Sequence, residues 1–230
     1  MTGWTEFALA LGLFGVSHFL PRVGGLRERL IGAVGRHAYF ATYGLLSLAL
    51  LAWLIAAAGR APHVELWPQL PWTRWVTNVA MPLAAVLTAC GAGLRQPFTL
   101  GGRKAPFDPG QPGLAAVSRH PLFLALALWA LAHLVPNGDL AHVILFGCFA
   151  AMALVAIPAF DARARRELGP EAARSFFRTT RVLSLAPLFD RTWLHANGTT
   201  LALRGAIGLL LWAALLHLHP LVIGVSPLPY

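Results

Sequence analysis

Six stretches of the chain are long, apolar and almost free of charge, and they restrict what the chain can fold into. They cover residues 4–20, 38–58, 76–94, 121–136, 140–160 and 202–222. A helix needs about 20 residues to cross the hydrocarbon core of a bilayer, where every backbone polar group must be bonded internally. With 57% hydrophobic and 12% charged residues, the composition also excludes an ordinary soluble domain. We therefore predict an all-α, polytopic integral membrane protein with about six transmembrane helices.

Basic residues in the connecting segments predict the orientation of these helices. They are concentrated in the first, third and fifth loops: Arg22, Arg27, Arg29, Arg36; Arg95, Arg103, Lys104, Arg119; and Arg163, Arg165, Arg166, Arg174, Arg178, Arg181, Arg191. The second and fourth loops hold only Arg60 and Arg74. Because basic loops stay in the cytoplasm, we expect both termini on the periplasmic side. The net charge of +9 is then first a sign of topology, and it also favours contact with anionic lipid of the bilayer.

Several classes of function lack a signature in this sequence. The basic clusters have no interleaved aromatic residues and no soluble module behind them, so we expect no nucleic acid partner. Cys90 and Cys148 lie singly, in a pattern that supports neither a disulfide framework nor a zinc site. There is no glycine-rich phosphate loop and no paired carboxylate. The sequence therefore gives little support for a hydrolytic enzyme.

Histidine is the chemically capable residue in surplus, and two of the nine are hard to explain as solvated or interfacial side chains. His18 is in the first run and His133 in the fourth, where a neutral imidazole needs a hydrogen-bond partner or a ligand. Heme iron is such a ligand, and a helical bundle can supply the apolar slot that the macrocycle needs. The alternative is that these histidines are structural and bond to neighbouring helices.

Motifs along most of the chain resemble the NnrU family of bacterial membrane proteins. They are "SHF" and "RERLIG" near the start, "VELW", "RHP" followed thirteen residues after His120 by His133, "NGD", "FDARARRELGPEAARSFF" and "LHLHPLVIGVSPLP". The resemblance implies one NnrU-like transmembrane domain over residues 1–230 in the bacterial inner membrane. The family is associated with denitrification and nitric oxide metabolism, and it is related to the 15-cis-zeta-carotene isomerases, which are membrane heme b enzymes.

The relation to these isomerases implies heme b with His18 and His133 as axial ligands. The isomerases have a cysteine three residues before the second histidine, where this chain has Ala130, so a thiolate switch cannot operate there. The depth of each histidine in the membrane instead favours His18 and His120 as the pair. His133 lies roughly 20 Å from His120 along a helix, whereas His18 and His120 are both near the cytoplasmic face. His18, His120 and His133 therefore all stay candidate heme ligands. Arg119 is a candidate contact for a heme propionate.

A weaker resemblance links the chain to isoprenylcysteine carboxyl methyltransferases. Those enzymes share an Arg-His-Pro motif followed by an acidic residue, a glycine near an aromatic residue, and an arginine before a proline. The matching positions here are Arg119, His120, Pro121, Asp161, Gly169, Phe176, Arg181 and Pro187. The alternative for Arg119 and Asp161 is a structural ion pair where two helices meet the cytoplasmic face.

Three functions follow from these patterns. We expect a heme protein with a role in denitrification, with a heme-dependent isomerase of a carotenoid or other apolar small molecule as the alternative. A membrane methyltransferase is the third. The sequence assigns no catalytic residue.

Overall fold

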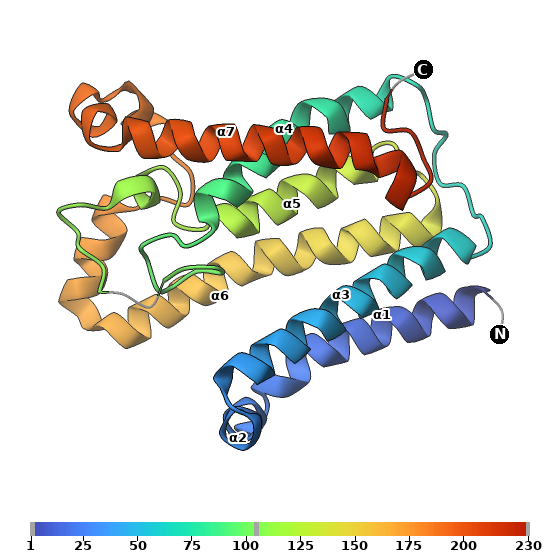
Figure 1. Ribbon diagram of the computed structural model, residues 1–230, viewed down its shortest axis with the longest axis horizontal. Coiled ribbons are helices and arrows are strands. Elements are labelled where there is room, and N and C mark those ends of the chain that lie inside the picture. The colour runs from blue at the N-terminus through green and yellow to red at the C-terminus, as the bar shows by residue number, and fades with distance from the viewer. Residues whose placement is uncertain (1–2, 104–105, 229–230) are drawn as a thin grey trace. The chain divides into compact units, whose positions relative to one another are not determined.

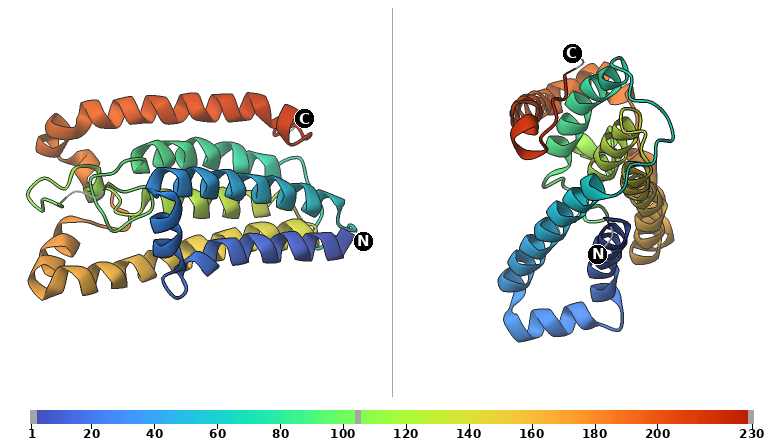
Figure 2. Two further views of the ribbon diagram at one scale, coloured as in Figure 1. Left: turned by 60° about the horizontal axis from the view of Figure 1, so that its bottom comes forward. Right: turned by 90° about the vertical axis from the view of Figure 1, so that its right-hand side faces the viewer.

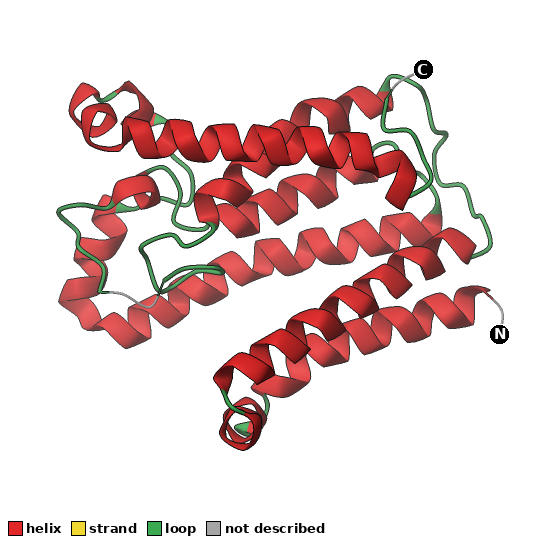
Figure 3. Ribbon diagram, in the orientation of Figure 1, coloured by secondary structure: helices red, strands yellow, loops and turns green. Residues whose placement is uncertain are grey.

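The protein is described from a computed structural model covering residues 3–103 and 106–228. Lys104 and the two chain ends, used above in the prediction of orientation, lie outside the described residues. The described part is helical, with an isolated bridge between Glu65 and Asp139 as its only β pairing (Figure 3). The predicted all-α class is therefore confirmed.

Each predicted apolar run falls largely within one helix, and three of these helices are long and apolar enough to cross a membrane. Those three are α3 (Arg36–Arg60), α6 (Leu140–Thr179) and α7 (Arg191–Val222). The runs at 4–20, 76–94 and 121–136 lie in α1 (Gly3–Phe19), α4 (Thr73–Gly91) and α5 (Pro121–Leu134), which are shorter or less apolar. Membrane character is thus supported, while six crossings stay a prediction.

Three segments differ from the helices that the apolar runs predict. The first basic loop contains η1 (Leu20–Arg22) and α2 (Leu26–Val34). Helix α6 continues well past the end of its apolar run, with a kink at Gly169, where φ is +73° and Pro170 follows. Helix α7 begins at Arg191, where the Asp190 side chain caps it by accepting hydrogen bonds from the Thr192 and Trp193 amides. Hydrophobicity alone could not predict these polar helical segments.

The chain forms two compact units, and the first runs to Pro68 and includes Gly138–Leu145. In it α1 and α3 pack as an antiparallel pair, and α2 lies across one end of the pair (Figure 2). Glu6 joins the other end, since its carboxylate accepts hydrogen bonds from Trp53 and Arg60 of α3. Near the start of α6, the Leu140 amide donates to Val64 and the Leu66 amide donates to Gly138.

The second unit contains Gln69–Asn137 and the chain from Phe146 onward. It holds α4, α5, most of α6 and α7, together with η2 (Gly113–Ala116) and η3 (Ala186–Phe189), and successive long helices run in alternating directions (Figure 1). Helix α4 lies between α5 and α7 and contacts both. Its interfaces are built from small residues, which is how helices in a bilayer approach closely. The buried ones include Ala80, Ala84 and Ala85 of α4 and Ala125, Ala127, Ala130 and Ala132 of α5.

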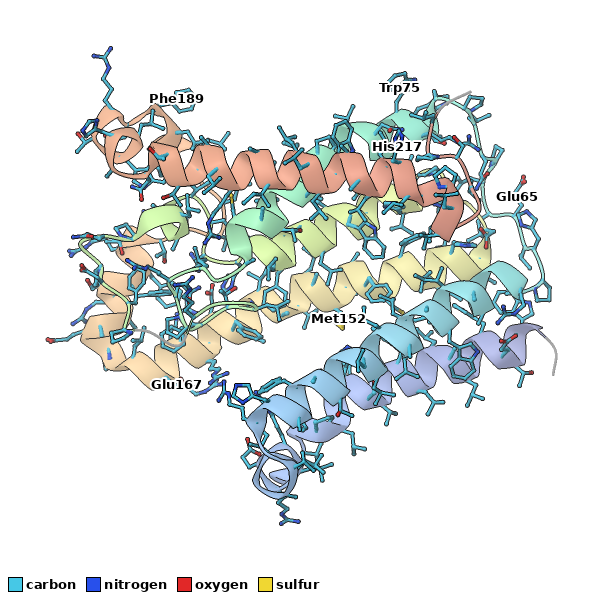
Figure 4. All side chains as sticks on the ribbon, viewed as in Figure 1. Glu65, Trp75, Met152, Glu167, Phe189 and His217 are labelled. Atoms are coloured by element: carbon cyan, nitrogen blue, oxygen red, sulfur yellow. The ribbon has the colours of Figure 1, made fainter. Side chains whose placement is uncertain are left out.

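Large apolar side chains point away from these helix pairs. Leu45 of α3, Val155 of α6 and Leu210 of α7 are each about 70% exposed. Trp75 of α4 also projects from the surface (Figure 4). An outward apolar surface of this extent fits contact with lipid chains.

Gly208 of α7 provides a test of the packing between α4 and α7. A Cβ atom there would lie 2.6 Å from the Cα of Val86, whereas a Cβ atom at Gly205, one turn earlier, would meet open space. We expect Gly208→Ala to lower the free energy of unfolding by about 1–3 kcal/mol, because the two backbones must separate. Gly205→Ala, the matched control, should leave the thermal midpoint unchanged or raise it slightly. Thermal unfolding in detergent measures both, and equal midpoints would contradict the close α4–α7 contact.

Candidate functional site

An ion pair between Arg119 and Asp161 forms the centre of a buried polar cluster in the second unit. Arg119 is the residue before His120 at the start of α5, and Asp161 lies on α6 just after its apolar run. The guanidinium donates through Nε and Nη2 to the two carboxylate oxygens, at 2.8 and 2.5 Å. Both side chains are about 90% buried, at 10% and 9% exposure. The ion pair, which the sequence offered as the alternative to a cofactor site, is therefore present.

His120 completes the cluster and has both of its ring nitrogens occupied. Its Nε2 lies 2.9 Å from Oδ1 of Asp161, and its Nδ1 lies 3.1 Å from the Thr99 hydroxyl. The carboxylate can only accept, so Nε2 carries the proton, and the neutral ring accepts at Nδ1 from the Thr99 hydroxyl. Burial lowers the pKa of His120 below its usual value, and the hydrogen bond with Asp161 only partly opposes this effect. His120 is therefore neutral at physiological pH, with no nitrogen lone pair left over.

Backbone contacts join this cluster to two further segments. The Arg119 amide donates to the carbonyl of Arg181, and the Ser184 amide donates to Val117. From the loop after α4, the buried side chain of Gln96 donates to the Arg119 carbonyl at 2.7 Å and accepts from the Phe98 amide. Four chain segments thus meet at "RHP". The side chains of Gln96, Arg119 and His120 each have hydrogen-bond partners within this cluster.

His133, in the last turn of α5, lies among aromatic side chains. Its ring is 5.3 Å from that of Trp129 and 5.2 Å from that of Phe146, measured between centroids. Its Nδ1 lies 2.7 Å from the carbonyl oxygen of Trp129, one turn earlier. Since a carbonyl can only accept, Nδ1 carries the proton and Nε2 has the lone pair. Within the described part of the chain, Nε2 of His133 has no hydrogen-bond partner.

His18 repeats this arrangement in the first unit. Its Nδ1 lies 2.8 Å from the carbonyl oxygen of Phe14, again one turn earlier, and its ring lies against that of Phe14, with the centroids 4.2 Å apart and the planes tilted by 32°. Tyr43 of α3 approaches the ring edge-on, at 5.9 Å between centroids. By the same argument the lone pair lies on Nε2, for which the described residues supply no hydrogen-bond partner.

The four predicted site residues thus differ in their bonding. Arg119 and His120 lie together and are satisfied by Asp161, whereas His18 and His133 each lie against aromatic rings with Nε2 unused. Sequence reasoning did not find Gln96, Thr99 and Thr180, which are all buried in the cluster. Each is a polar residue in a loop or at a helix end, where sequence gives no signal of burial.

Comparison with known proteins identifies the family. A family model described as NnrU protein matches residues 6–227, nearly the whole chain. The chain belongs to the NnrU family. No curated protein and no solved structure gives a match. The resemblance seen in the sequence motifs is therefore confirmed for NnrU, whereas the relations to carotenoid isomerases and to methyltransferases stay predictions.

In this NnrU-family chain, Asp161→Asn should be strongly destabilising. The variant leaves the Arg119 guanidinium buried without its counter-ion, a change that typically costs about 3–5 kcal/mol. Glu167→Gln is the matched control on the same helix, since it breaks an exposed ion pair with Arg163 and should have little effect (Figure 4 labels Glu167). The measurement is the thermal midpoint in detergent. A stable Asp161→Asn protein would argue that the pair serves ligand binding instead.

Proposed function

We propose that this NnrU-family protein binds heme b through His18 and His133, in the bacterial inner membrane, and has an auxiliary role in nitric oxide metabolism and denitrification. The observation that carries the proposal is the hydrogen bonding of the two imidazoles. Each donates Nδ1–H to the carbonyl four residues earlier. This bond fixes the tautomer in which Nε2 is a metal donor.

The surroundings of both histidines suit an apolar macrocycle. Phe14 and Tyr43 lie against His18, while Trp129 and Phe146 lie against His133. The hydrogen bonds to Phe14 and Trp129 hold each ring in one orientation and raise the basicity of Nε2. When bound, heme would supply a one-electron redox centre or a Lewis acid. The contribution of the chain is to orient the two donors and to keep water away from them.

The other two predicted site residues are better explained without heme. His120 has no lone pair left, and the Arg119 guanidinium already donates to both oxygens of Asp161. A methyltransferase site would use this same motif to hold its cofactor, and here the motif is occupied by contacts within the protein. We therefore assign Arg119, His120 and Asp161 to the stability of the fold.

Heme content of single variants tests the ligand assignment. We expect His18→Ala and His133→Ala each to lose most of the bound heme, because one of the two imidazole donors is missing. His120→Ala should keep its heme and lose stability only. The exposed His63 is the matched control, and His63→Ala should have the heme content of the wild type. Absorbance in the Soret region, relative to protein in detergent, measures the outcome.

Two results would contradict this assignment. Heme lost on His120→Ala and kept on His133→Ala would mean that the hydrogen bonds of His120 are exchanged for iron. Heme kept in all the variants would mean that other residues bind it. His219 would then be the next candidate, since its Nδ1 also lies 2.7 Å from a carbonyl oxygen, that of Val225.

Isomerisation of an apolar polyene is the second candidate function. It is favoured by the aromatic cluster around His133, where Trp129 also contacts Phe149 edge-on at 5.6 Å. A flat, extended hydrocarbon could lie against such rings and reach the site from the lipid. Incubation of the heme-loaded protein with a cis polyene, followed by chromatography of the isomers, separates this activity from a purely auxiliary role.

The proposed membrane topology has six crossings, with both termini in the periplasm. Reporter fusions after Gly59 and Gly138 should report a periplasmic location, and fusions after Arg103 and Gly169 a cytoplasmic one, because basic loops stay inside. Helix α5 is the critical element, since it has only 14 residues. A cytoplasmic signal from the Gly138 fusion would show that α5 enters the membrane without crossing it.

A further inference from the structure

A pocket of about 720 Å³ opens in the second unit, and its lining includes none of the histidines discussed above. It lies where the loop after α4 meets the first turns of α7, and residues 110–114 close a third side. The Trp193 indole donates to the Gly113 carbonyl at 3.2 Å and so ties this third side to α7. The volume is in the range of small-molecule binding sites.

Three arginines line the pocket. Arg95 and Arg103 are exposed, and neither side chain has a hydrogen bond or ion pair among the described residues. Backbone hydrogen bonds within the loop, from Gly93 to Gly101 and from Arg103 to Leu94, hold the two on one side of the pocket. Arg204, on α7, donates through Nη1 to the carbonyls of Ala89, Cys90 and Ala92 at the end of α4, and its Nε and Nη2 have no hydrogen-bond partner among the described residues.

Asp190 is the acidic residue of the pocket lining, and its carboxylate is already in use. It accepts hydrogen bonds from the Thr192 and Trp193 amides at the start of α7. Three arginines therefore line a space whose one lining carboxylate already accepts two hydrogen bonds. Guanidinium groups bind phosphate by paired, charge-assisted hydrogen bonds.

We propose that this pocket binds a phosphate group, and that its source is the headgroup of an anionic phospholipid. The apolar surface of α7 supports the lipid source. Leu203, Ile207 and Leu210 follow one face of the helix from the edge of the pocket, and they are 62%, 50% and 71% exposed. A phosphate held at Arg204 would let the acyl chains lie along this face. Basic pockets between helices on the cytoplasmic side are a known mode of binding for such headgroups.

The test uses the full-length protein in detergent with three additives. Phosphatidylglycerol should raise the thermal midpoint of the wild type, whereas phosphatidylcholine and free glycerol phosphate should not. The double variant Arg95→Gln with Arg103→Gln should bind phosphatidylglycerol at least about tenfold more weakly, since each charged hydrogen bond contributes roughly a factor of ten or more. Arg204 is left intact because it also caps α4.

Arg166→Gln with Arg178→Gln is the matched control, because it removes the same charge from exposed positions of α6 outside the pocket. The control variant should bind phosphatidylglycerol as tightly as the wild type. If both double variants lost affinity for this lipid equally, the pocket would not be the binding site, and a general attraction between the basic protein and anionic lipid would explain the binding. Equal shifts of the thermal midpoint with phosphatidylglycerol and phosphatidylcholine would show that the protein does not recognise the negative charge of the headgroup. An equal effect of glycerol phosphate would overturn the lipid source. Heme content should be unchanged in both variants, so this proposal and the proposed function can fail separately.

Discussion

The buried ion pair between Arg119 and Asp161 is the contact on which the second unit depends. It joins the start of α5 to α6, and hydrogen bonds of the neighbouring residues extend the connection to the loop after α4 and to the segment after α6. Charges removed from water are costly unless they are paired and fully bonded. Here the Asp161 carboxylate accepts hydrogen bonds from both Arg119 and His120, so its negative charge is paired and its oxygens are bonded. Four segments must therefore be in place before any of these charges can be buried.

Small residues supply the second constraint, which is close approach of the helices. Lipid chains are as apolar as leucine, so helices in a bilayer gain little by burying large side chains against one another. In the second unit the buried positions of α4 and α5 are mostly alanine, and Gly208 lets the backbone of α7 reach Val86. Many large aliphatic side chains, such as Leu83, Val155 and Leu210, are left on the outside, whereas phenylalanines such as Phe123 and Phe176 are buried.

The three histidines predicted as heme ligands take two bonding states, and the position of each in its helix decides which. Within a helix, the imidazoles of His18 and His133 reach the carbonyl one turn earlier and keep Nε2 as a lone-pair donor. His120 precedes the first turn of α5, with Pro121 after it, and its ring instead meets Asp161 and Thr99. The first state is suited to a metal, whereas the second is suited to joining segments. Sequence spacing alone treats all three residues as equal candidates.

The all-α class, the positions of the apolar helices and the family could all be predicted from the sequence, which also offered the pairing of Arg119 with Asp161 as one of two alternatives. These features depend on local hydrophobicity or on residue types at recognisable spacings, which are present in the chain before it folds. The polar helices α2 and the end of α6 were missed, because no apolar run marks them. Only the tertiary structure decided that Gln96 and Thr99 are buried, that His120 has no free nitrogen, and that Arg95, Arg103 and Arg204 line one pocket. Each of these depends on residues distant in sequence meeting in space, and no local pattern encodes such a meeting.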